Sequence, residues 1–428
     1  MSQDRIITVD VAVVGGGPAG LSACLELARS QGTTVALFES ETELGGIPRS
    51  CHVFFGMRDL KRIHSGPTYA KKLDRLVRKT KTDIYTNATV IQIVPRGDGS
   101  RHLLKVVTKE GLIQCFCKCV LLATGCFERS RESRRIPGSR PAGVFTTGSL
   151  QQVVNLQGSK PGNRALIIGS EHVSLSAALT LKSAGTTIAG MVSDDSYPHT
   201  YPLAAKVIGA ALGFPILQNF SVSAILGKTR VEAVDLECRK TGKHLQMACD
   251  TVVCTGKFRP DAALIYKTTI REDGASMGPE VDMSMMTSEE GIFAAGNVLR
   301  GADMHDICAL EGRRVAQNII QHIEMKNNTE NEIVKIRAAD PIRYVVPQRL
   351  SESRIRNWKT SFFQPGVSIQ LSRTMKKIRL EALSGGKIIW SRKYTRIIGN
   401  NRIQIPVENF EWGKIDFSKG IFLRVADI

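Results

Sequence analysis

The chain opens on an apolar run that changes abruptly to glycine, and this pattern predicts its first structural unit. Residues 9–14 (VDVAVV) are almost wholly apolar, which is typical of a parallel strand buried on both faces. A helix of about residues 19–30 and a second apolar strand over residues 34–38 are expected to follow. Strand, helix and strand in this order predict a βαβ unit over residues 1–40.

The alternation of helical and strand patterns continues well past the first unit. A glycine-rich loop over residues 45–49 is expected to be non-helical. A helix is expected over residues 67–80, followed by a β-meander over residues 89–94, 103–107 and 112–123. A second βαβ pattern starts at residues 165–169, and a second meander, over residues 221–247, follows it. An apolar strand within residues 291–298 and a helix over about residues 304–324 complete this part of the chain.

The pattern changes after residue 326. Residues 327–340 are polar without clear periodicity and are predicted to be a linker. Beyond them only short β-rich runs occur, over residues 367–371, 377–383, 387–394, 402–407 and 421–425. Short strands separated by glycine- and asparagine-rich turns favour a small β-sandwich.

A glycine motif joins the first strand to the first helix. Gly15, Gly17 and Gly20 have the GxGxxG spacing, and Glu39 ends the second strand. Gly15 permits a tight turn, Gly17 lets the backbone approach a pyrophosphate, and Gly20 lets the helix pack on the strand. Glu39 lies where a carboxylate accepts ribose hydroxyls. The pattern predicts a dinucleotide site, with the pyrophosphate at the helix N-terminus.

The second βαβ unit carries a damaged copy of this motif. Gly169 is present, but Glu171 and Ser174 stand at the second and third glycine positions. Glu171 would place bulk and negative charge where a pyrophosphate lies. A second dinucleotide in this unit is therefore doubtful.

Composition bounds the class of protein. A chain of 428 residues is too long to fold around a single hydrophobic core. Its contents of 42% hydrophobic and 23% charged residues are ordinary for a globular protein. No apolar run is long enough to span a membrane and no signal peptide is visible, so a cytoplasmic location is expected. An oligomer is possible.

The net charge is +18, and residues 341–428 alone hold 17 Lys and Arg against 6 Asp and Glu. Such a surface attracts anionic partners or substrates. Nucleic acid is not expected, because no nucleic-acid-binding motif accompanies the charge.

Three of the ten cysteines, Cys115, Cys117 and Cys119, alternate along one predicted strand. They share one face, which is expected to be buried and reduced. A metal or redox role is the alternative, but ligands on one flat strand do not converge tetrahedrally, and we predict no metal site. No CxxC dithiol motif is present.

Four motifs together resemble the pyridine nucleotide–disulfide oxidoreductase-like flavoproteins: the first glycine motif with Glu39, Ala123-Thr124-Gly125, Cys254-Thr255-Gly256 and the run from Gly291 to Asn297. The resemblance covers about residues 8–325 and implies FAD. The residues expected to hold it are Gly15, Gly17, Pro18, Ala19, Gly20, Glu39, Ser40, Gly45, Gly46, Arg49, Val90, Ala123, Thr124, Gly125, Gly296 and Asn297. Most members of the family carry Asp at the position of Asn297.

The runs 123–129, 136–138, 141–148, 296–300 and 311–313 are similar to one subgroup, the FAD subunits of multi-component dehydrogenases. It includes hydrogen cyanide synthase, opine oxidase, dye-linked amino-acid dehydrogenases and proteins that accompany glycerol-3-phosphate dehydrogenase. The resemblance implies a dehydrogenase, or a component of one, that oxidises a small amine, amino acid or hydroxy compound and passes electrons to a partner subunit or acceptor. The alternatives are an NAD(P)H-dependent flavin reductase and a non-catalytic flavin-containing assembly subunit.

Oxidation of an amine or alcohol needs a base near the carbon that loses hydride. His52 and His305 are the candidates, with His64 a weaker one, and a structural role is the alternative for each. Asp303 could pair with His305 or cap the last helix. Arg49, Arg58 and Arg62 could bind an anionic substrate, and the alternative is that they are ordinary surface arginines.

The predicted fold class is α/β, with two Rossmann-like three-layer (ββα) dinucleotide-binding domains that carry β-meanders, and a C-terminal β-sandwich-like domain. The expected division is an FAD domain in two parts (1–155 and 276–326), a second NAD(P)-like domain (156–275), the linker (327–340) and the basic C-terminal domain (341–428).

Overall fold

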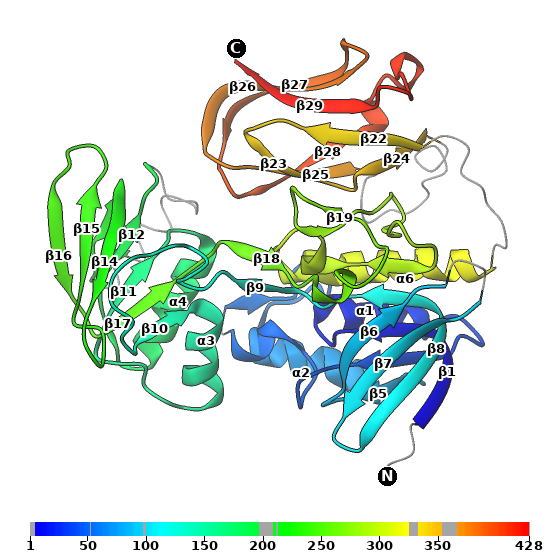
Figure 1. Ribbon diagram of the computed structural model, residues 1–428, viewed down its shortest axis with the longest axis horizontal. Coiled ribbons are helices and arrows are strands. Elements are labelled where there is room, and N and C mark those ends of the chain that lie inside the picture. Colours follow the sequence, from blue (N-terminus) through cyan, green and yellow to red (C-terminus); the bar gives the residue numbers. More distant parts are fainter. Residues whose placement is uncertain are drawn as a thin grey trace.

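The computed structural model describes residues 5–51, 53–96, 100–196, 209–210, 213–324, 333–352 and 366–427. Figure 1 shows a lobe built from the N-terminal segment together with helix α6, a second lobe beside it, and a C-terminal lobe above the first. His52, one of the two candidate bases, lies outside the described residues.

The first apolar run forms β1 (Arg5–Val14) at the centre of the first sheet. The sheet order is β5-β2-β1-β8-β7-β6, from β5 (Asp83–Tyr85), β2 (Val35–Phe38), β8 (Gly111–Leu122), β7 (His102–Thr108) and β6 (Thr89–Val94). β1 pairs in parallel with β2 and β8, which places Glu39 and the glycine motif at the same edge of the sheet.

β8 lies between the parallel strands of this sheet and its antiparallel meander. Its residues 111–117 pair with β7, whereas residues 120–122 pair in parallel with β21 (Ile292–Ala294). A segment from far along the chain therefore completes the parallel sheet, as the Gly291–Asn297 motif predicts.

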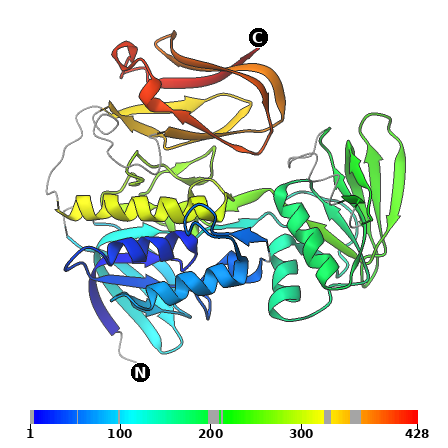
Figure 2. The same ribbon diagram turned by 180° about the vertical axis from the view of Figure 1, so that it is seen from behind.

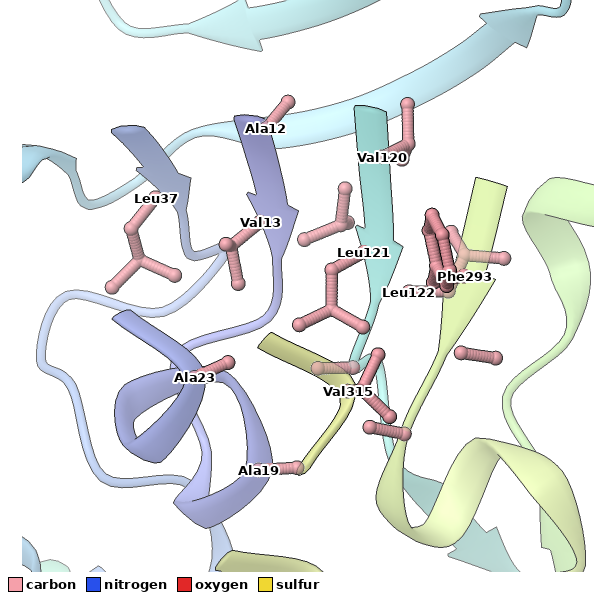
Figure 3. Packing of buried hydrophobic residues seen from close by; sticks show 14 of the residues in the cluster. Ala12, Val13, Ala19, Ala23, Leu37, Val120, Leu121, Leu122, Phe293 and Val315 are labelled. Atoms are coloured by element: carbon pink, nitrogen blue, oxygen red, sulfur yellow. The ribbon is translucent and has the colours of Figure 1, made fainter. Parts of the chain in front are cut away.

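Three helices cover one face of this sheet: α1 (Pro18–Leu27), α2 (Gly66–Val77) and α6 (His305–Glu324), seen in front of the strands in Figure 2. Ala19 and Ala23 of α1 pack towards Val315 of α6 and the strands (Figure 3). A side chain at Gly312 would collide with the backbone of Ala19, so glycine lets the two helices meet closely.

The cysteine prediction is confirmed in this core. Cys115, Cys117 and Cys119 are all buried on β8, and all ten cysteines of the chain are unpaired. Burial raises the pKa of Cys119 to about 12, so its thiol stays protonated at neutral pH.

The second lobe is a parallel sheet with its own meander. The sheet order is β10-β17-β11-β12-β13, from β10 (Val144–Thr146), β17 (Thr251–Cys254), β11 (Arg164–Ile168), β12 (Thr187–Ser193) and β13 (Ile216–Gln218). Its helices are α3 (Thr147–Gln151) and α4 (His172–Ser183), with a π-helical turn η2 (Gln152–Leu156). The meander is β14 (Phe220–Leu226), β15 (Ala233–Cys238) and β16 (His244–Ala248).

A short two-stranded ribbon joins the two lobes. β9 (Cys126–Glu128) pairs antiparallel with β18 (Phe258–Pro260), and Figure 1 shows both between the lobes. Glu128 accepts hydrogen bonds from the backbone N–H groups of Gly148 and Gly256. Burial raises the pKa of Glu128 despite these bonds.

The C-terminal lobe is a β-sandwich. One sheet has the order β24-β22-β29-β26-β27, from β24 (Arg349–Ser351), β22 (Ile333–Ala338), β29 (Ile421–Asp427), β26 (Met375–Ser384) and β27 (Lys387–Ile397). The other has the order β23-β25-β28, from β23 (Ile342–Val346), β25 (Gly366–Leu371) and β28 (Arg402–Pro406). Buried residues of both sheets share one hydrophobic cluster.

Two local predictions need correction. The predicted linker 327–340 contains β22, which pairs with β24 and β29, so the sandwich includes residues 333–338. Its inward residues, Val334 and Ile336, alternate with exposed Lys335 and Arg337, and the polar neighbourhood obscures this period. The glycine loop at 45–49, which we expected to be non-helical, runs into a 3-10 turn, η1 (Ile47–Ser50).

The short elements that remain are β3 (Phe54–Phe55), β4 (His64–Ser65), η3 (Ala263–Ile265), β19 (Glu272–Asp273), β20 (Gly278–Pro279), η4 (Gly296–Leu299), η5 (Val407–Asn409) and η6 (Trp412–Lys414). The predicted α/β class with two Rossmann-like units and a β-rich C-terminal part is confirmed. The other domain boundaries stay predictions. Among the described residues, no helix is long and apolar enough to cross a membrane.

Candidate functional site

A cavity of about 2610 Å³ lies where the three lobes meet. Its wall includes the ends of β1 and β2, the η1 turn, the start of α6, the start of α4 and part of the C-terminal sandwich. Apolar side chains that are half exposed or more, such as Met57 and Met304, also face it.

The first glycine motif forms an open cradle on this wall. Gly15 has a φ of +107°, and a side chain there would collide with the carbonyl of Ala123. Gly17 is the N-cap of α1, makes no side-chain cap, and has open space where a Cβ would lie. The first-turn N–H groups of α1 therefore have no capping side chain, and they face a space that an anionic group can enter.

Glu39 is held in place beside this cradle. Its side chain is buried, and its carboxylate accepts hydrogen bonds from Gly16 N–H (2.7 Å), Glu41 N–H (2.8 Å) and the Ser40 hydroxyl (3.2 Å). A carboxylate has about four acceptor positions, so these three bonds leave acceptor capacity for a ribose hydroxyl.

The structure brings most of the predicted cofactor residues to this one cavity. Those on its wall are Gly15, Gly17, Pro18, Ala19, Glu39, Ser40, Gly46, Arg49, Val90, Ala123, Thr124, Gly125 and Asn297. Gly20, Gly45 and Gly296 lie behind the wall instead. Each allows a close approach there: Gly20 to the carbonyl of Gly15, Gly45 to Ala70 and Gly296 to Ala19.

Asn297 is fixed by the start of α6. Its side-chain oxygen accepts hydrogen bonds from Asp303 N–H (2.9 Å) and from the Cys308 thiol (3.0 Å). The amide nitrogen of Asn297 can therefore donate into the cavity, where a carboxylate at this position could only accept.

A buried group of charges lies directly behind Asn297. Arg300 pairs with Glu311 and with Asp303 (3.0 Å), and Arg402 of the sandwich reaches Asp303 at 2.8 Å and Glu311 at 3.5 Å. We call these four residues the ion cluster. Glu311 also accepts the N–H of Gly296, so the cluster connects the sandwich to the Gly296–Asn297 turn.

The ion cluster also answers the question about Asp303. Its carboxylate pairs with two arginines and accepts the N–H of Met304, which precedes α6. Among the described residues, Asp303 has no hydrogen bond to His305 and none to a first-turn N–H of α6. Burial acts to raise the pKa of Asp303, but the charges of Arg300 and Arg402 outweigh it and hold the pKa below its usual range. One guanidinium nitrogen of Arg300, Nη1, is buried without a partner among the described residues.

His305 is the candidate base that the structure places at the cavity. It is the first residue of α6, and its ring meets Phe55 edge-on at 4.3 Å between centroids. Burial lowers the pKa of His305 to about 4, so the imidazole is neutral at pH 7. His64 lies on β4, and its Nε2 is buried without a hydrogen-bond partner among the residues that the structure describes; it is not part of the cavity wall.

This burial predicts a pH effect on stability. Between pH 6.5 and about 4 the unfolded chain binds a proton at residue 305 that the folded chain does not. The free energy of unfolding should therefore fall as the pH falls through this window, by up to about 3 kcal/mol. Denaturant titrations of wild type and His305→Gln across the window should show a smaller decrease in the variant.

His244→Gln provides the control for that comparison, because His244 is exposed on β16. It should leave the wild-type pH dependence unchanged. Equal pH dependence in His305→Gln and wild type would show that His305 is not buried as described.

The second glycine motif forms a closed cradle. Glu171 is the N-cap of α4 and forms a capping box with Ser174, whose hydroxyl oxygen accepts the N–H of Glu171 (3.0 Å). The carboxylate of Glu171 accepts hydrogen bonds from the hydroxyls of Ser174 (3.1 Å) and Thr255 (3.2 Å). A side chain on Gly169 or Gly256 would come within 2.6 Å of this carboxylate. The carboxylate thus occupies the space at the helix N-terminus that stays open at Gly17.

Several residues of the site were not assigned a role from sequence. Arg300 and Glu311 stand in the motifs that carried the family resemblance, so a signal for them existed, but Tyr344 and Arg402 lie in the sandwich and carried none. Arg49 pairs with Glu43 at 3.1 Å, and Arg58 lies 3.8 Å from Asp306.

One open and one closed glycine cradle, each at the end of a parallel sheet and joined by a two-stranded ribbon, define a protein with two Rossmann-like dinucleotide-binding units. Residues 9–324 match the family model described as pyridine nucleotide-disulphide oxidoreductase, and the chain belongs to this family. Its members are FAD-binding flavoproteins, so FAD is the cofactor and the chain is an FAD-dependent oxidoreductase. The open cradle at Gly17 and the acceptor at Glu39 fit that cofactor.

Individual relatives agree with the predicted resemblance. Hydrogen cyanide synthase subunit HcnB of Pseudomonas aeruginosa is 33% identical over 184 residues, covering 42% of this chain and 37% of that protein. The small chain of glutamate synthase [NADPH] from Halomonas elongata is 21% identical over 346 residues, covering 74% of this chain and 68% of that protein. The chain thus spans little more than a third of the length of the HcnB relative.

A solved structure shows the same fold. Thioredoxin reductase of T. acidophilum superposes with a TM-score of 0.63 at 20% identity, covering 74% of this chain and 99% of that one.

Proposed function

We propose that the protein is a dehydrogenase, or the flavin-carrying component of one, that oxidises a small amine, amino acid or hydroxy compound without NAD(P)H. The observation that carries the proposal is the contrast between the two cradles: Gly17 leaves the N-terminus of α1 open, whereas Glu171 caps α4 with its own carboxylate. A pyrophosphate at α4 would have to displace this carboxylate and would meet its negative charge.

In this proposal the residues of the first cradle hold FAD. The N–H groups at the start of α1 bind the pyrophosphate, Glu39 accepts the ribose hydroxyls, and Asn297 donates to the ribityl chain. Bound FAD supplies a two-electron acceptor for the hydride that leaves the substrate carbon. The proton released from the substrate nitrogen or oxygen goes to a base, for which neutral His305 is our candidate at the cavity wall.

A partner subunit or external acceptor must remove the electrons, since the proposal assigns no pyridine nucleotide to this chain. The HcnB relative is by name a subunit, as is the small chain of glutamate synthase, which supports a multi-subunit assembly here. We also propose a cytoplasmic location, which ten unpaired cysteines support because disulfides form in oxidising compartments.

The test is a pair of reduction assays on purified yellow protein under anaerobic conditions. Amino acids, opines and glycerol 3-phosphate are screened with an artificial dye acceptor, and NADH and NADPH are mixed with the protein in a stopped-flow instrument. We expect at least one organic substrate to bleach the flavin and the nicotinamides to leave it oxidised. Rapid bleaching by NADH or NADPH would favour the flavin reductase; the name of the glutamate synthase relative contains NADPH, which agrees with that alternative.

The second alternative, an assembly subunit without catalysis, rests on the basic sandwich. The edge strand β27 presents exposed Arg392, Lys393 and Arg396, which suit an acidic partner. This alternative would be supported by protein that binds FAD but whose flavin is reduced by none of the tested substrates. The same protein should also no longer bind its partner when these three residues are changed to Gln.

A further inference from the structure

The C-terminal sandwich forms part of the cavity wall. Strands β23, β25 and β28 place Arg343, Gln370 and Arg402 beside one another, because Gln370 pairs in register with Tyr344 and Arg402. Tyr344 is buried in the hydrophobic cluster of the first lobe, and Arg402 belongs to the ion cluster. This sheet is therefore fixed against the turn that carries Asn297.

Most arginines on the cavity wall already have partners. Arg134 donates to the carbonyl oxygens of Arg129, Thr255 and Gly256, and Arg239 pairs with Asp194 at 3.4 Å. Arg49, Arg58, Arg300 and Arg402 have the carboxylate neighbours given above. These guanidinium groups already have carbonyl or carboxylate acceptors within the protein.

Three arginines on the wall, Arg129, Arg135 and Arg343, form no ion pair with a carboxylate in the part of the chain that the structure describes. Arg135 is exposed, whereas Arg129 donates to the Met277 sulfur (3.5 Å) and its charge acts on Arg343. Arg343 donates to the side-chain oxygen of Gln370 (3.3 Å), and Gln370 is held in turn by the carbonyl of Asn400 (2.6 Å). Arg343 is thus oriented by a neutral group that leaves its charge uncompensated.

The positive charge of Arg129 also acts on Arg343. Desolvation at the cavity wall and this like charge lower the pKa of Arg343. Two like charges that face one cavity repel, and an anion bound between them relieves that repulsion. Guanidinium groups suit this task because their donors match the oxygens of a carboxylate or phosphate. Phe127, which precedes Arg129 by two residues and is 50% exposed, offers an apolar surface at the same wall.

We propose that Arg129 of the inter-lobe ribbon and Arg343 of the C-terminal sandwich together bind the anionic group of the substrate. The substrate is then a small organic anion, a carboxylate or a phosphate ester, and the sandwich is part of the substrate site. This inference rests on the proposed dehydrogenase function and narrows its substrate class.

The test measures anion binding directly, without turnover. Holoprotein is titrated with acetate, with inorganic phosphate and with chloride by calorimetry at constant ionic strength. We expect saturable binding of acetate or phosphate, weakened about tenfold or more in Arg129→Gln and in Arg343→Gln. Saturation by acetate identifies a carboxylate substrate, and saturation by phosphate identifies a phosphate ester.

Lys393→Gln is the matched control, since it removes one positive charge from the exposed edge strand of the same sandwich. It should bind the anion as wild type does, and all three variants should retain FAD. No saturable binding of acetate or phosphate, equal binding of chloride, or equal affinity in the arginine variants and wild type would each overturn the proposal.

The outcome is distinguishable from that of the dehydrogenase proposal. If substrates bleach the flavin but the arginine variants bind anions normally, the function stands and the anion site is wrong. If anions bind through the two arginines but no substrate bleaches the flavin, the site stands and the dehydrogenase function is wrong.

Discussion

Gly17→Glu is expected to give colourless protein that cannot be reconstituted with FAD. Gly17 has open space at its Cβ position and caps α1 without a side chain. A glutamate there would place a carboxylate at the helix N-terminus, as Glu171 does at α4. Repulsion of the pyrophosphate should weaken FAD binding by a thousandfold or more, equivalent to about 4 kcal/mol. Flavin absorbance after gel filtration, with and without added FAD, measures the effect.

Gly274→Glu is the control for this experiment. Gly274 also has open space at its Cβ position and an ordinary φ, but it lies on the exposed surface away from the cavity. The control protein should be yellow and should unfold like wild type. A yellow Gly17→Glu protein would contradict the assignment of the first cradle to FAD.

Glu311→Ala should produce the largest loss of stability among single changes at the site. Removing this carboxylate leaves Arg300 buried without its closest partner and frees Gly296 N–H. Breaking a buried pair by removing one partner costs about 3–5 kcal/mol, because the remaining charge is not compensated. Denaturant titrations of the holoprotein measure this loss, and we expect FAD to dissociate at a lower denaturant concentration than in wild type.

A surface pair shows how much of that loss is due to burial. Glu132 pairs with Arg140 at 2.9 Å, and both side chains are more than half exposed. Glu132→Ala should cost less than about 1 kcal/mol, the range measured for exposed pairs. If Glu311→Ala costs no more than Glu132→Ala, the ion cluster does not stabilise the fold as we describe.

The sequence predicted the first cradle well because its signals are local. Gly15 and Gly20 are required by backbone conformation and close packing, so the residue type itself records the geometry. Glu39 is recognisable because a buried strand fixes its distance from the glycines. The damage to the second motif was visible for the same reason, although the sequence did not show that Glu171 would cap its own helix.

Contacts between segments far apart in the sequence could not be predicted from the sequence pattern. Arg402 lies 99 residues from Asp303, and no spacing rule connects them. The sequence pattern predicts a linker over β22 because Lys335 and Arg337 face solvent among other polar residues. The place of Arg343 on the wall of the cavity depends on how the sandwich sits on the first lobe, which only the assembled fold determines.

The close contact of α1 with α6 has a consequence for synthesis of the protein. The first cradle needs β21 and α6, yet Gly312 follows Ala19 by 293 residues, an interval that contains the whole second lobe. At about 5–20 residues per second, a ribosome needs tens of seconds to reach α6 after it has made α1. During that interval the N-terminal strand and helix lack the partners that complete their lobe, whereas the second lobe is complete in sequence and free to fold. FAD can therefore join the chain only late in translation, after α6 has left the ribosome.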